Sequence, residues 1–159
     1  MILAIDLATK TGFALGADSI TLSGTQSFAP DKGALPATRF GKFNRWFALM
    51  LRSYPDISLV AYEMPHYRGR PATECLVGLA TRVQEQCVEA GIRFVSVHSL
   101  TLKKFATGSG RADKAAMLVA AVAQWPDKKF ADDNDCDACW LWQYAHDNVA
   151  TPEKRSTNP

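Results

Sequence analysis

The chain has 159 residues, of which 47% are hydrophobic and 21% are charged. This composition excludes wholesale disorder, and no apolar run reaches the roughly 18 residues that a membrane-spanning helix needs. Eighteen basic residues against sixteen acidic ones leave a net charge of +2, so only local charge clusters can indicate a partner. The opening stretch MILAIDLATKTG lacks the basic start and long apolar run of a signal peptide, which predicts a cytoplasmic protein.

The first 63 residues predict three strands, a helix and a further strand. The segments ILAID, FALGA and 19–28 are short apolar or alternating runs separated by turn-forming residues. Apolar residues recur at three-and-four spacing over 36–54, which predicts an amphipathic helix. A buried strand is expected over 57–63. The polar face of the amphipathic helix carries four basic residues: Arg39, Lys42, Arg45 and Arg52.

The rest of the chain predicts alternating helices and strands. A helix over 71–90 ends at Gly91, and a strand over 92–97 follows. Ser99 is expected to cap a short helix, and two more helices are predicted over 111–125 and 135–148. This order predicts an α/β fold with a five-stranded mixed sheet, three antiparallel strands first, and helices on both faces. We expect one domain over 1–150 and a flexible C-terminal tail over 151–159.

Acidic residues end two of the predicted strands and precede the last helix. Asp6 closes the first strand and Glu63 the fourth, at the strand edge where open α/β sheets bind their ligands. Acids that converge there would repel each other, and a divalent cation would relieve that repulsion. Oxygen-only ligands favour Mg²⁺ or Mn²⁺. The alternative is that these acids form turns and that the DDND run is a solvated helix start.

The acidic run offers several choices for a further ligand. Asp133 and Asp137 are four residues apart and share a helix face if the helix begins early enough. Asn134 and Asp137 are three apart and could also converge, whereas Asp135 points to a different side. The predicted metal ligands are therefore Asp6, Glu63, Asp137 and Asp133. Asn134 or Asp135 remains open as the fourth.

Two features are interpreted as core. Cys136 and Cys139 form a C-x-x-C in a helical segment next to tryptophans, which favours buried side chains over a redox or zinc pair. Six aromatic residues at helical spacing are assigned to the core rather than to base stacking: Phe40, Phe43, Trp46, Phe47, Trp140 and Trp142.

Four segments in order, IDLATKTGFA, AYEMPHYRGR, SLTLKKFATGSGRADKAAM and DDNDCDACWLW, resemble the motifs of RuvC-type Holliday junction resolvases. The resemblance is to the compact phage-type branch of this family, within the RNase H and retroviral-integrase superfamily. The stretch K-x-x-x-x-G-x-G-x-A-D-K, from Lys103 to Lys114, is its most specific part. The resemblance implies an RNase H-like fold and a homodimer that cuts two strands of a four-way DNA junction symmetrically, in recombination and repair. A phage origin would place the protein in the host cytoplasm.

The resemblance also implies roles for single residues. Asp6, Glu63 and Asp137 match the family's acids, and Lys103 and Lys114 match its two basic residues after the fifth strand. Many members carry an acid or histidine where this chain has Asn134, and that is a departure. Two Mg²⁺ ions, for which Mn²⁺ would substitute, would lie astride the scissile phosphate. Lys114 would balance charge that develops in the transition state.

DNA contacts are expected from basic and aromatic residues after strand ends, where glycines let the backbone approach phosphates. By resemblance, His66 or Tyr67 falls at the position where the bacterial enzymes carry an aromatic residue that probes the junction centre. The helix over 71–90, with Leu76, Leu79, Ala80 and Val83, is a candidate dimer interface, and ordinary core is the equal alternative. The full set of predicted DNA-binding residues is His66, Tyr67, Arg68, Arg70, Lys103, Lys104, Arg111 and Lys114.

Two alternative functions remain open, and a third is disfavoured. One is an RNase H-like or YqgF-like nuclease that acts on RNA or on RNA–DNA hybrids. Another is a branched-DNA-binding protein without catalysis, which the asparagine at position 134 leaves possible. An ATP-binding fragment of the sugar-kinase class is disfavoured, because no phosphate-binding loops of that class are found and the chain is too short for its second domain.

Overall fold

The structure, a computed structural model, describes residues 1–67 and 69–150. Its five-stranded sheet has the order β3-β2-β1-β4-β5. The strands β3, β2 and β1 pair antiparallel, and β1, β4 and β5 pair parallel, so the predicted mixed α/β sheet is confirmed. The strands are β1 (Ile2–Asp6), β2 (Lys10–Gly16), β3 (Ile20–Ser27), β4 (Leu59–Glu63) and β5 (Arg93–Val97).

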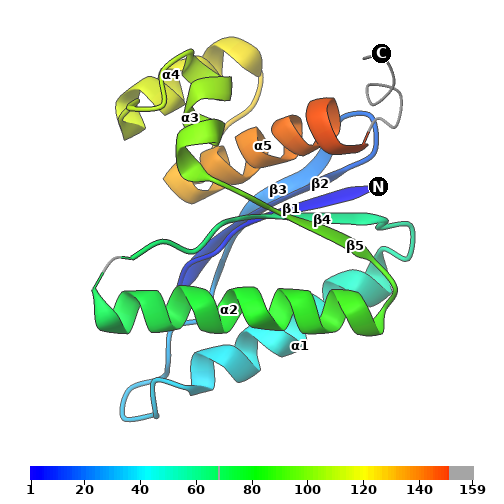
Figure 1. The fold of residues 1–159 in the computed structure, drawn as a ribbon, viewed down its shortest axis with the longest axis vertical. Helices are drawn as coiled ribbons and strands as arrows, with labels where there is room; N and C mark the ends of the chain where they lie inside the picture. The colour runs from blue at the N-terminus through cyan, green and yellow to red at the C-terminus, as the bar shows by residue number, and fades with distance from the viewer. Residues whose placement is uncertain (68, 151–159) are drawn as a thin grey trace, which may run out of the picture.

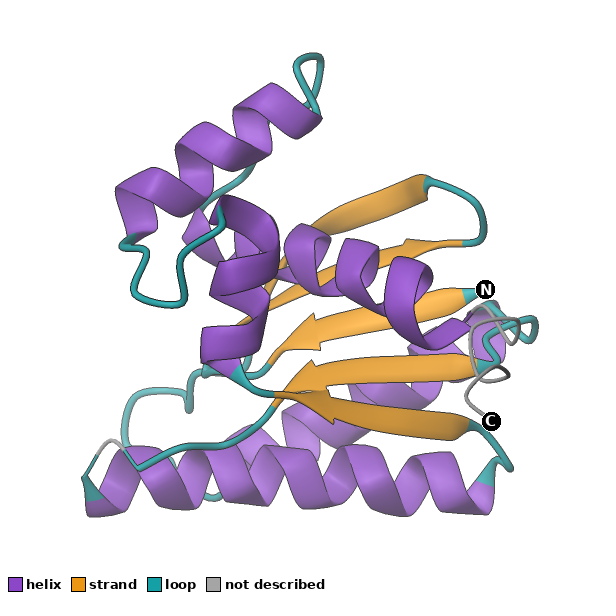
Figure 2. Ribbon diagram, turned by 45° about the horizontal axis from the view of Figure 1, so that its top comes forward, coloured by secondary structure: helices purple, strands orange, loops and turns teal. Residues whose placement is uncertain are grey.

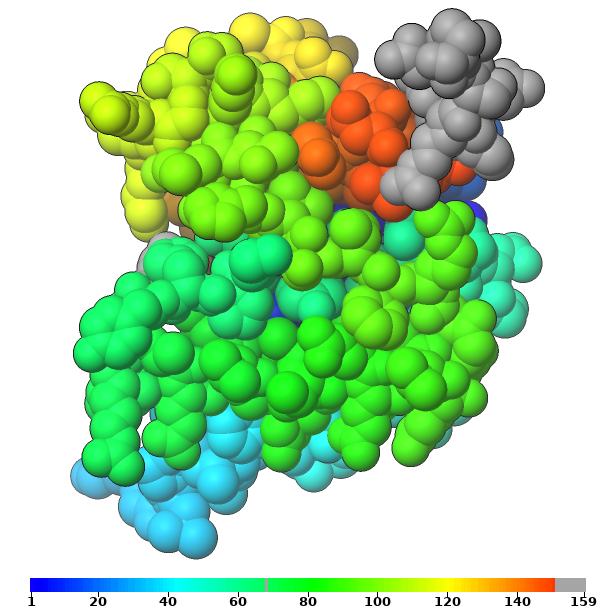
Figure 3. All heavy atoms as spheres, in the orientation of Figure 1, coloured from blue at the N-terminus to red at the C-terminus, as the bar shows by residue number. Residues whose placement is uncertain are grey.

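Helices cover both faces of the sheet (Figure 1). On one face lie α1 (Thr38–Ser53) and α2 (Arg70–Glu89), and on the other lie α3 (Ser99–Thr107), α4 (Lys114–Gln124) and α5 (Asp133–Ala145). Figure 2 shows the same layers with the strand ends of β1, β4 and β5 pointing toward one edge. In the space-filling view, α2 runs across the middle of one face and the α3–α4 pair lies above it (Figure 3). A π-helical turn, η1 (His146–Ala150), follows α5, and the predicted tail over 151–159 lies outside the described residues.

The alternation of side chains along two strands determines where the acids lie. In β1, Ile2 and Ala4 join the core on the α5 side of the sheet, and Leu3 and Ile5 join the core on the side of α1 and α2. In β4, Leu59 and Ala61 lie on the α5 side in the same way. The two strands are parallel neighbours in which Ile2 pairs with Leu59 and Ala4 with Ala61. The next residues in this alternation are the terminal acids of each strand, so the pleat directs both toward α5.

Side-chain caps account for two helix starts, and for the cap of a third helix, that differ from the sequence-based expectation. The last helix begins at Asp133 rather than at 135, because the Asp132 side chain accepts hydrogen bonds from two backbone N–H groups of its first turn. The alanine-rich helix begins at Lys114 rather than at 111, since Asp113 caps it in the same manner. The short helix α3 is capped by His98, whose Nδ1 accepts from the N–H of Leu100, so the prediction of Ser99 as its cap was wrong.

The residues predicted as core lie in two clusters, one on each side of the sheet. Four of the six predicted aromatics are buried, and Phe40 and Trp46 are partly buried against the same cores. All four cysteines are buried and free, and burial raises the pKa of the Cys136 and Cys139 thiols to about 12. The C-x-x-C is therefore part of the core, as predicted. Within residues 1–67 and 69–150, no helix is both long and apolar enough to cross a lipid bilayer.

Candidate active site

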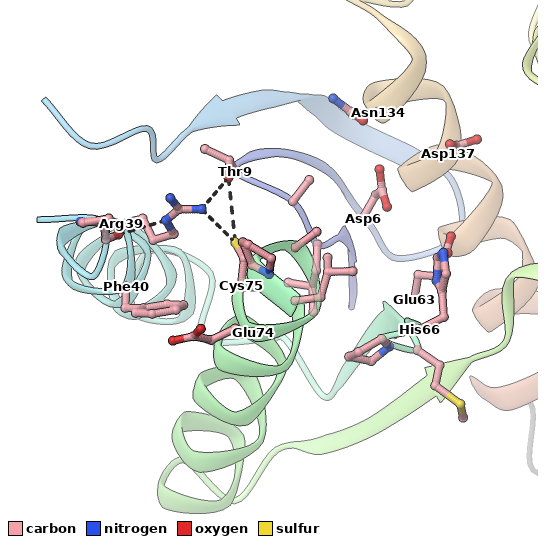
Figure 4. Close-up of a pocket in the computed structure, with 18 of the residues that line it drawn as sticks. Asp6, Thr9, Arg39, Phe40, Glu63, His66, Glu74, Cys75, Asn134 and Asp137 are labelled. Carbon is pink, nitrogen blue, oxygen red and sulfur yellow. Dashed lines mark hydrogen bonds and ion pairs between the residues drawn. The ribbon is translucent and has the colours of Figure 1, made fainter. Parts of the chain in front are cut away.

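Three acidic side chains from distant parts of the chain line one cavity. Asp6 comes from the end of β1, Glu63 from the end of β4, and Asp137 from the second turn of α5. The cavity has a volume of about 740 Å³, and Asn134 and Lys114 also line it. Figure 4 shows Asp6, Glu63 and Asp137 on the same side of this cavity, with Asp137 on the helix that crosses the strand ends.

The ionisation of Asp137 is disfavoured in the folded protein, and Glu63 contributes to this effect. Burial, and then the nearby negative charge of Glu63, raise the pKa of Asp137 from 3.8 to about 6. Lys114 and Lys103 act in the opposite direction, and Asp133 adds to the rise. Burial is therefore the main cause of the raised pKa of Asp137, and the charge of Glu63 adds to it.

The start of α5 is fixed to the sheet by two polar contacts and one glycine. The Asp132 cap forms an ion pair with Lys10 at the start of β2. A Cβ atom on Gly12 would lie 1.9 Å from the carbonyl oxygen of Asn134, so only glycine lets the first turn of α5 approach the strand this closely. The buried Asp135 accepts a 2.6 Å hydrogen bond from Ser23 of β3 and a 2.9 Å bond from the backbone N–H of Ala131.

The structure separates the three choices for a fourth ligand. Asn134 lines the cavity together with the three acids. Asp133 does not line the cavity; it is half-exposed and accepts a 2.9 Å hydrogen bond from Lys114, whose pKa it raises. Asp135 is buried and faces β3 rather than the cavity. Asn134 is therefore the residue of the three that shares the cavity with the acids, although the sequence favoured Asp133.

Lys114 and Lys103, the two residues that match the family's basic residues by resemblance, lie close to the acids. Lys114, the first residue of α4, lines the cavity, and Asp137 and Asp6 also help to raise its pKa after the larger effect of Asp133. Lys103 on α3 is half-buried and lies near enough to lower the pKa of Asp137. Two lysines from two helices thus flank one side of the carboxylate cluster.

The other predicted DNA-binding residues fall in two groups around the cavity. After β4, His66 lines the cavity with its Nδ1 3.7 Å from a Glu63 carboxylate oxygen, and Tyr67 is 80% exposed. Arg70, also exposed, begins α2, and Arg68 lies outside the described residues. Lys104 and Arg111 are exposed on and after α3.

The opposite wall of the cavity was not predicted from the sequence. It includes Thr9, Arg39, Phe40 and Cys75. The helical pattern placed Arg39 on the polar face of α1 with three other basic residues. In the structure its guanidinium instead contacts Thr9 and Cys75. No sequence signal could have found these contacts, because they join α1 to residues 30 and 36 positions away in the chain.

The donor atoms suit a hard divalent cation. The side chains that face this part of the cavity offer carboxylate and amide oxygens, which Mg²⁺ and Mn²⁺ prefer. Across residues 1–67 and 69–150, no three His, Cys, Asp or Glu side chains lie close enough together to hold an ion as they stand. A cation would therefore need side-chain rotation of the acids, while the strand ends and α5 already bring their backbones to one cavity.

The stability of the metal-free protein should depend on the ionisation of Asp137, which burial and then the charge of Glu63 disfavour. A folded-state pKa of about 6 against 3.8 means that the folded state binds this proton more tightly than the unfolded chain. The ionised carboxylate then costs stability, by about 1–3 kcal/mol, above pH 6, and this cost vanishes below about pH 4. We expect Asp137→Asn to raise the melting temperature in EDTA by about 3–8 °C at pH 7.5 and to have no effect near pH 3.5.

The matched control for this measurement is Asp133→Asn, which removes an acid of the same helix that is half-exposed and paired with Lys114. Its effect should stay within about 0.5 kcal/mol at either pH. If Asp137→Asn behaved like this control in thermal scans at both pH values, ionisation of Asp137 would carry no cost in the folded protein.

A mixed sheet of this order, with acids at the ends of β1 and β4 and on the last helix, defines the RNase H-like fold class. Two solved structures of RuvC from Thermus thermophilus match this fold over 91% of this chain and 94% of theirs. One is RuvC in complex with a Holliday junction substrate, with a TM-score of 0.73 and 18% identity, and the other has a TM-score of 0.71 and 15% identity. The predicted RuvC-type fold is confirmed. No family model and no curated protein matches the sequence.

Proposed function

We propose that this protein is a Mg²⁺-dependent endonuclease that resolves four-way DNA junctions. The observation that carries the proposal is the meeting of Asp6, Glu63 and Asp137 in one cavity of a RuvC-type fold, beside Lys114. The similar RuvC structure that contains a Holliday junction substrate supports branched DNA as the substrate.

The acids fit the cofactor that the proposal requires. Asp6, Glu63 and Asp137 would hold Mg²⁺, with the Asn134 side-chain oxygen as the fourth donor and Asp133 as the alternative. The raised pKa of Asp137 supports this assignment, because a bound cation would offset both causes of it, the burial of the carboxylate and the negative charge of Glu63. When bound, two Mg²⁺ ions would supply an activated water and would stabilise the leaving 3′ oxygen.

The chain's own residues would orient the phosphate and balance its charge. Lys114 is exposed and lies at the cavity, so its ammonium group can exchange Asp133 for a phosphate oxygen. The pair with Asp133 would keep Lys114 near the site before DNA binds. Lys103 would add positive charge on the same side. The product would be a nick that carries a 5′ phosphate.

Symmetric cutting of a junction needs two active sites, and we infer a homodimer for that reason. The α2 helix can supply only part of an interface, because Leu79, Ala80 and Val83 are buried in the protein's own core. Its outer face exposes Val77 and Val88, with 45% and 70% of their surface accessible. Sedimentation of the protein with and without a junction tests the dimer.

The affinity for a junction should depend steeply on salt, because the residues around the cavity would contact phosphates. We expect the dissociation constant to rise at least about 100-fold between 50 and 200 mM salt, since each neutralised phosphate releases counterions. Lys104→Gln should lower the slope of log affinity against log salt by about one. Lys32→Gln, which removes an exposed charge in the loop before α1, should leave that slope unchanged. A flat wild-type affinity would contradict phosphate contacts.

The proposed function is tested by incubating the protein with labelled substrates in Mg²⁺ or in EDTA. The substrates are a four-way junction, a fork, a linear duplex and an RNA–DNA hybrid of matched sequence. We expect paired nicks in the junction in Mg²⁺, little cleavage of the linear duplex, and none in EDTA. Preferred cleavage of the hybrid would favour an RNase H-like nuclease instead, and tight junction binding without cleavage would favour a non-catalytic binder.

A further inference from the structure

The cavity that contains the acids has a second polar group on its opposite wall. Arg39 lies in the first turn of α1, and its Nε donates a 2.9 Å hydrogen bond to the carbonyl oxygen of Pro36. Its Nη1 donates to the Thr9 hydroxyl at 3.1 Å and to the Cys75 sulfur at 3.2 Å. Figure 4 shows the guanidinium held between Thr9 and Cys75, across the cavity from Asp6 and Glu63.

The charge of Arg39 has no counter-ion within the described chain. No carboxylate of residues 1–67 and 69–150 lies within the 4.0 Å ion-pair distance of its guanidinium nitrogens. Glu74, the acid on the same wall, is exposed to solvent. Arg39 itself is half-buried, and the hydrogen bonds that replace part of its hydration come from uncharged groups, so its positive charge is not balanced. This position therefore favours an anionic ligand.

The contacts of Arg39 also orient the group for such a ligand. With Nε and Nη1 engaged, the guanidinium plane is fixed and its Nη2 donates to no described residue. The Thr9 hydroxyl accepts from Arg39, so its proton can be donated to the Cys75 sulfur or to a ligand oxygen. A fixed guanidinium and an adjacent hydroxyl match the oxygens of a phosphate diester. Pro36, Ala37 and Phe40 provide an apolar wall beside them, against which a sugar could pack.

We propose that Arg39 and Thr9 bind a DNA backbone phosphate other than the scissile one. This inference rests on the proposed function, because it assumes that a DNA strand enters the cavity. A strand held at Arg39 on one wall has only a limited set of its phosphates within reach of the acids on the other wall. The Arg39 subsite, defined here as Arg39 and Thr9, would thus select which phosphate is cut.

The test combines a protein charge change with a DNA charge change. Junctions are prepared that carry a single neutral methylphosphonate at each position on either side of the scissile phosphate. Their affinities for wild-type protein, Arg39→Gln and Arg45→Gln are measured in Ca²⁺. Arg45 is the matched control, because it is exposed on the same helix and does not line the cavity.

For wild type and Arg45→Gln, we expect one methylphosphonate near the scissile position to weaken binding about 5- to 10-fold. Arg39→Gln should bind the unmodified junction more weakly than wild type by a similar factor. The same methylphosphonate should lower the affinity of Arg39→Gln by less than a further factor of about 2. Its cleavage in Mg²⁺ should spread to neighbouring phosphates. If Arg39→Gln proved unfolded, the wild-type methylphosphonate scan and Arg39→Lys, which keeps the charge, would still decide.

The outcomes distinguish this inference from the proposed function. If wild-type protein cuts junctions, but Arg39→Gln responds to every methylphosphonate as Arg45→Gln does, the Arg39 subsite is overturned and the nuclease stands. If wild-type protein neither binds nor cuts any junction, the proposed function is overturned, and with it the inference.

Discussion

Replacement of Asp6 by asparagine is expected to lower the rate of junction cleavage by at least about 10³-fold. Asp6 ends β1 and lines the cavity with Glu63 and Asp137, so the change removes one negative charge from the centre of the proposed metal site. The amide has nearly the same shape as the carboxylate but binds a divalent cation more weakly. Single-turnover cleavage of a labelled four-way junction in Mg²⁺ measures the effect.

Two comparisons make this result specific. Junction affinity in Ca²⁺ should change little for Asp6→Asn, since the basic residues around the cavity remain. Asp18→Asn removes an exposed acid in the turn between β2 and β3, and it should cut at the parental rate. Parental cleavage by purified Asp6→Asn protein would mean that the acid takes no part in the chemistry.

Of the variants proposed, Gly12→Ala is expected to lose the most stability. The loss of about 2–3 kcal/mol in the free energy of unfolding would lower the melting temperature by about 5–10 °C. The new Cβ would lie 1.9 Å from the carbonyl oxygen of Asn134 and 2.4 Å from its carbonyl carbon. These are backbone atoms of the first turn of α5, so relief requires the helix to move. Asp137 would move with it, and cleavage should fall even at temperatures where the variant is folded.

Gly24→Ala is the matched control, because Gly24 is the residue of β3 that pairs with Phe13 of β2. A Cβ at this position would meet only the Phe13 ring, at 3.7 Å, which is an ordinary contact. Its effect should stay within about 0.5 kcal/mol. Equal melting temperatures for the two variants would show that the start of α5 does not depend on this close approach.

Much of the fold follows from local patterns. The strands were predictable because apolar runs of the right length end in glycine, proline or acids, and the helices because apolar residues recur at helical spacing. Asp6 and Glu63 were predictable as site residues because parallel strands bring their carboxyl ends to one edge. The alternation of Ile2, Ala4 and Asp6, matched by Leu59, Ala61 and Glu63, even assigns the two acids to one face.

What the sequence could not supply depends on contacts between distant segments. The choice among Asp133, Asn134 and Asp135 turns on where α5 begins, and that start is fixed by Lys10 and Gly12 of β2. Asp135 is two positions from Asp137 and faces another side of α5, as the sequence predicted, but its partner there, Ser23 of β3, lies more than a hundred residues earlier in the chain and could not be predicted. A helical pattern alone cannot express such contacts.

The central claim is that Asp6, Glu63 and Asp137 together hold divalent cations, and Mn²⁺ binding tests it without relying on cleavage. Electron paramagnetic resonance measures how much free Mn²⁺ remains when wild-type protein, Asp6→Asn, Asp137→Asn or Asp18→Asn is added. We expect wild type and Asp18→Asn to remove Mn²⁺ from solution equally, and Asp6→Asn and Asp137→Asn to bind it much more weakly. Equal Mn²⁺ binding by all four proteins, or none by wild type, would contradict it.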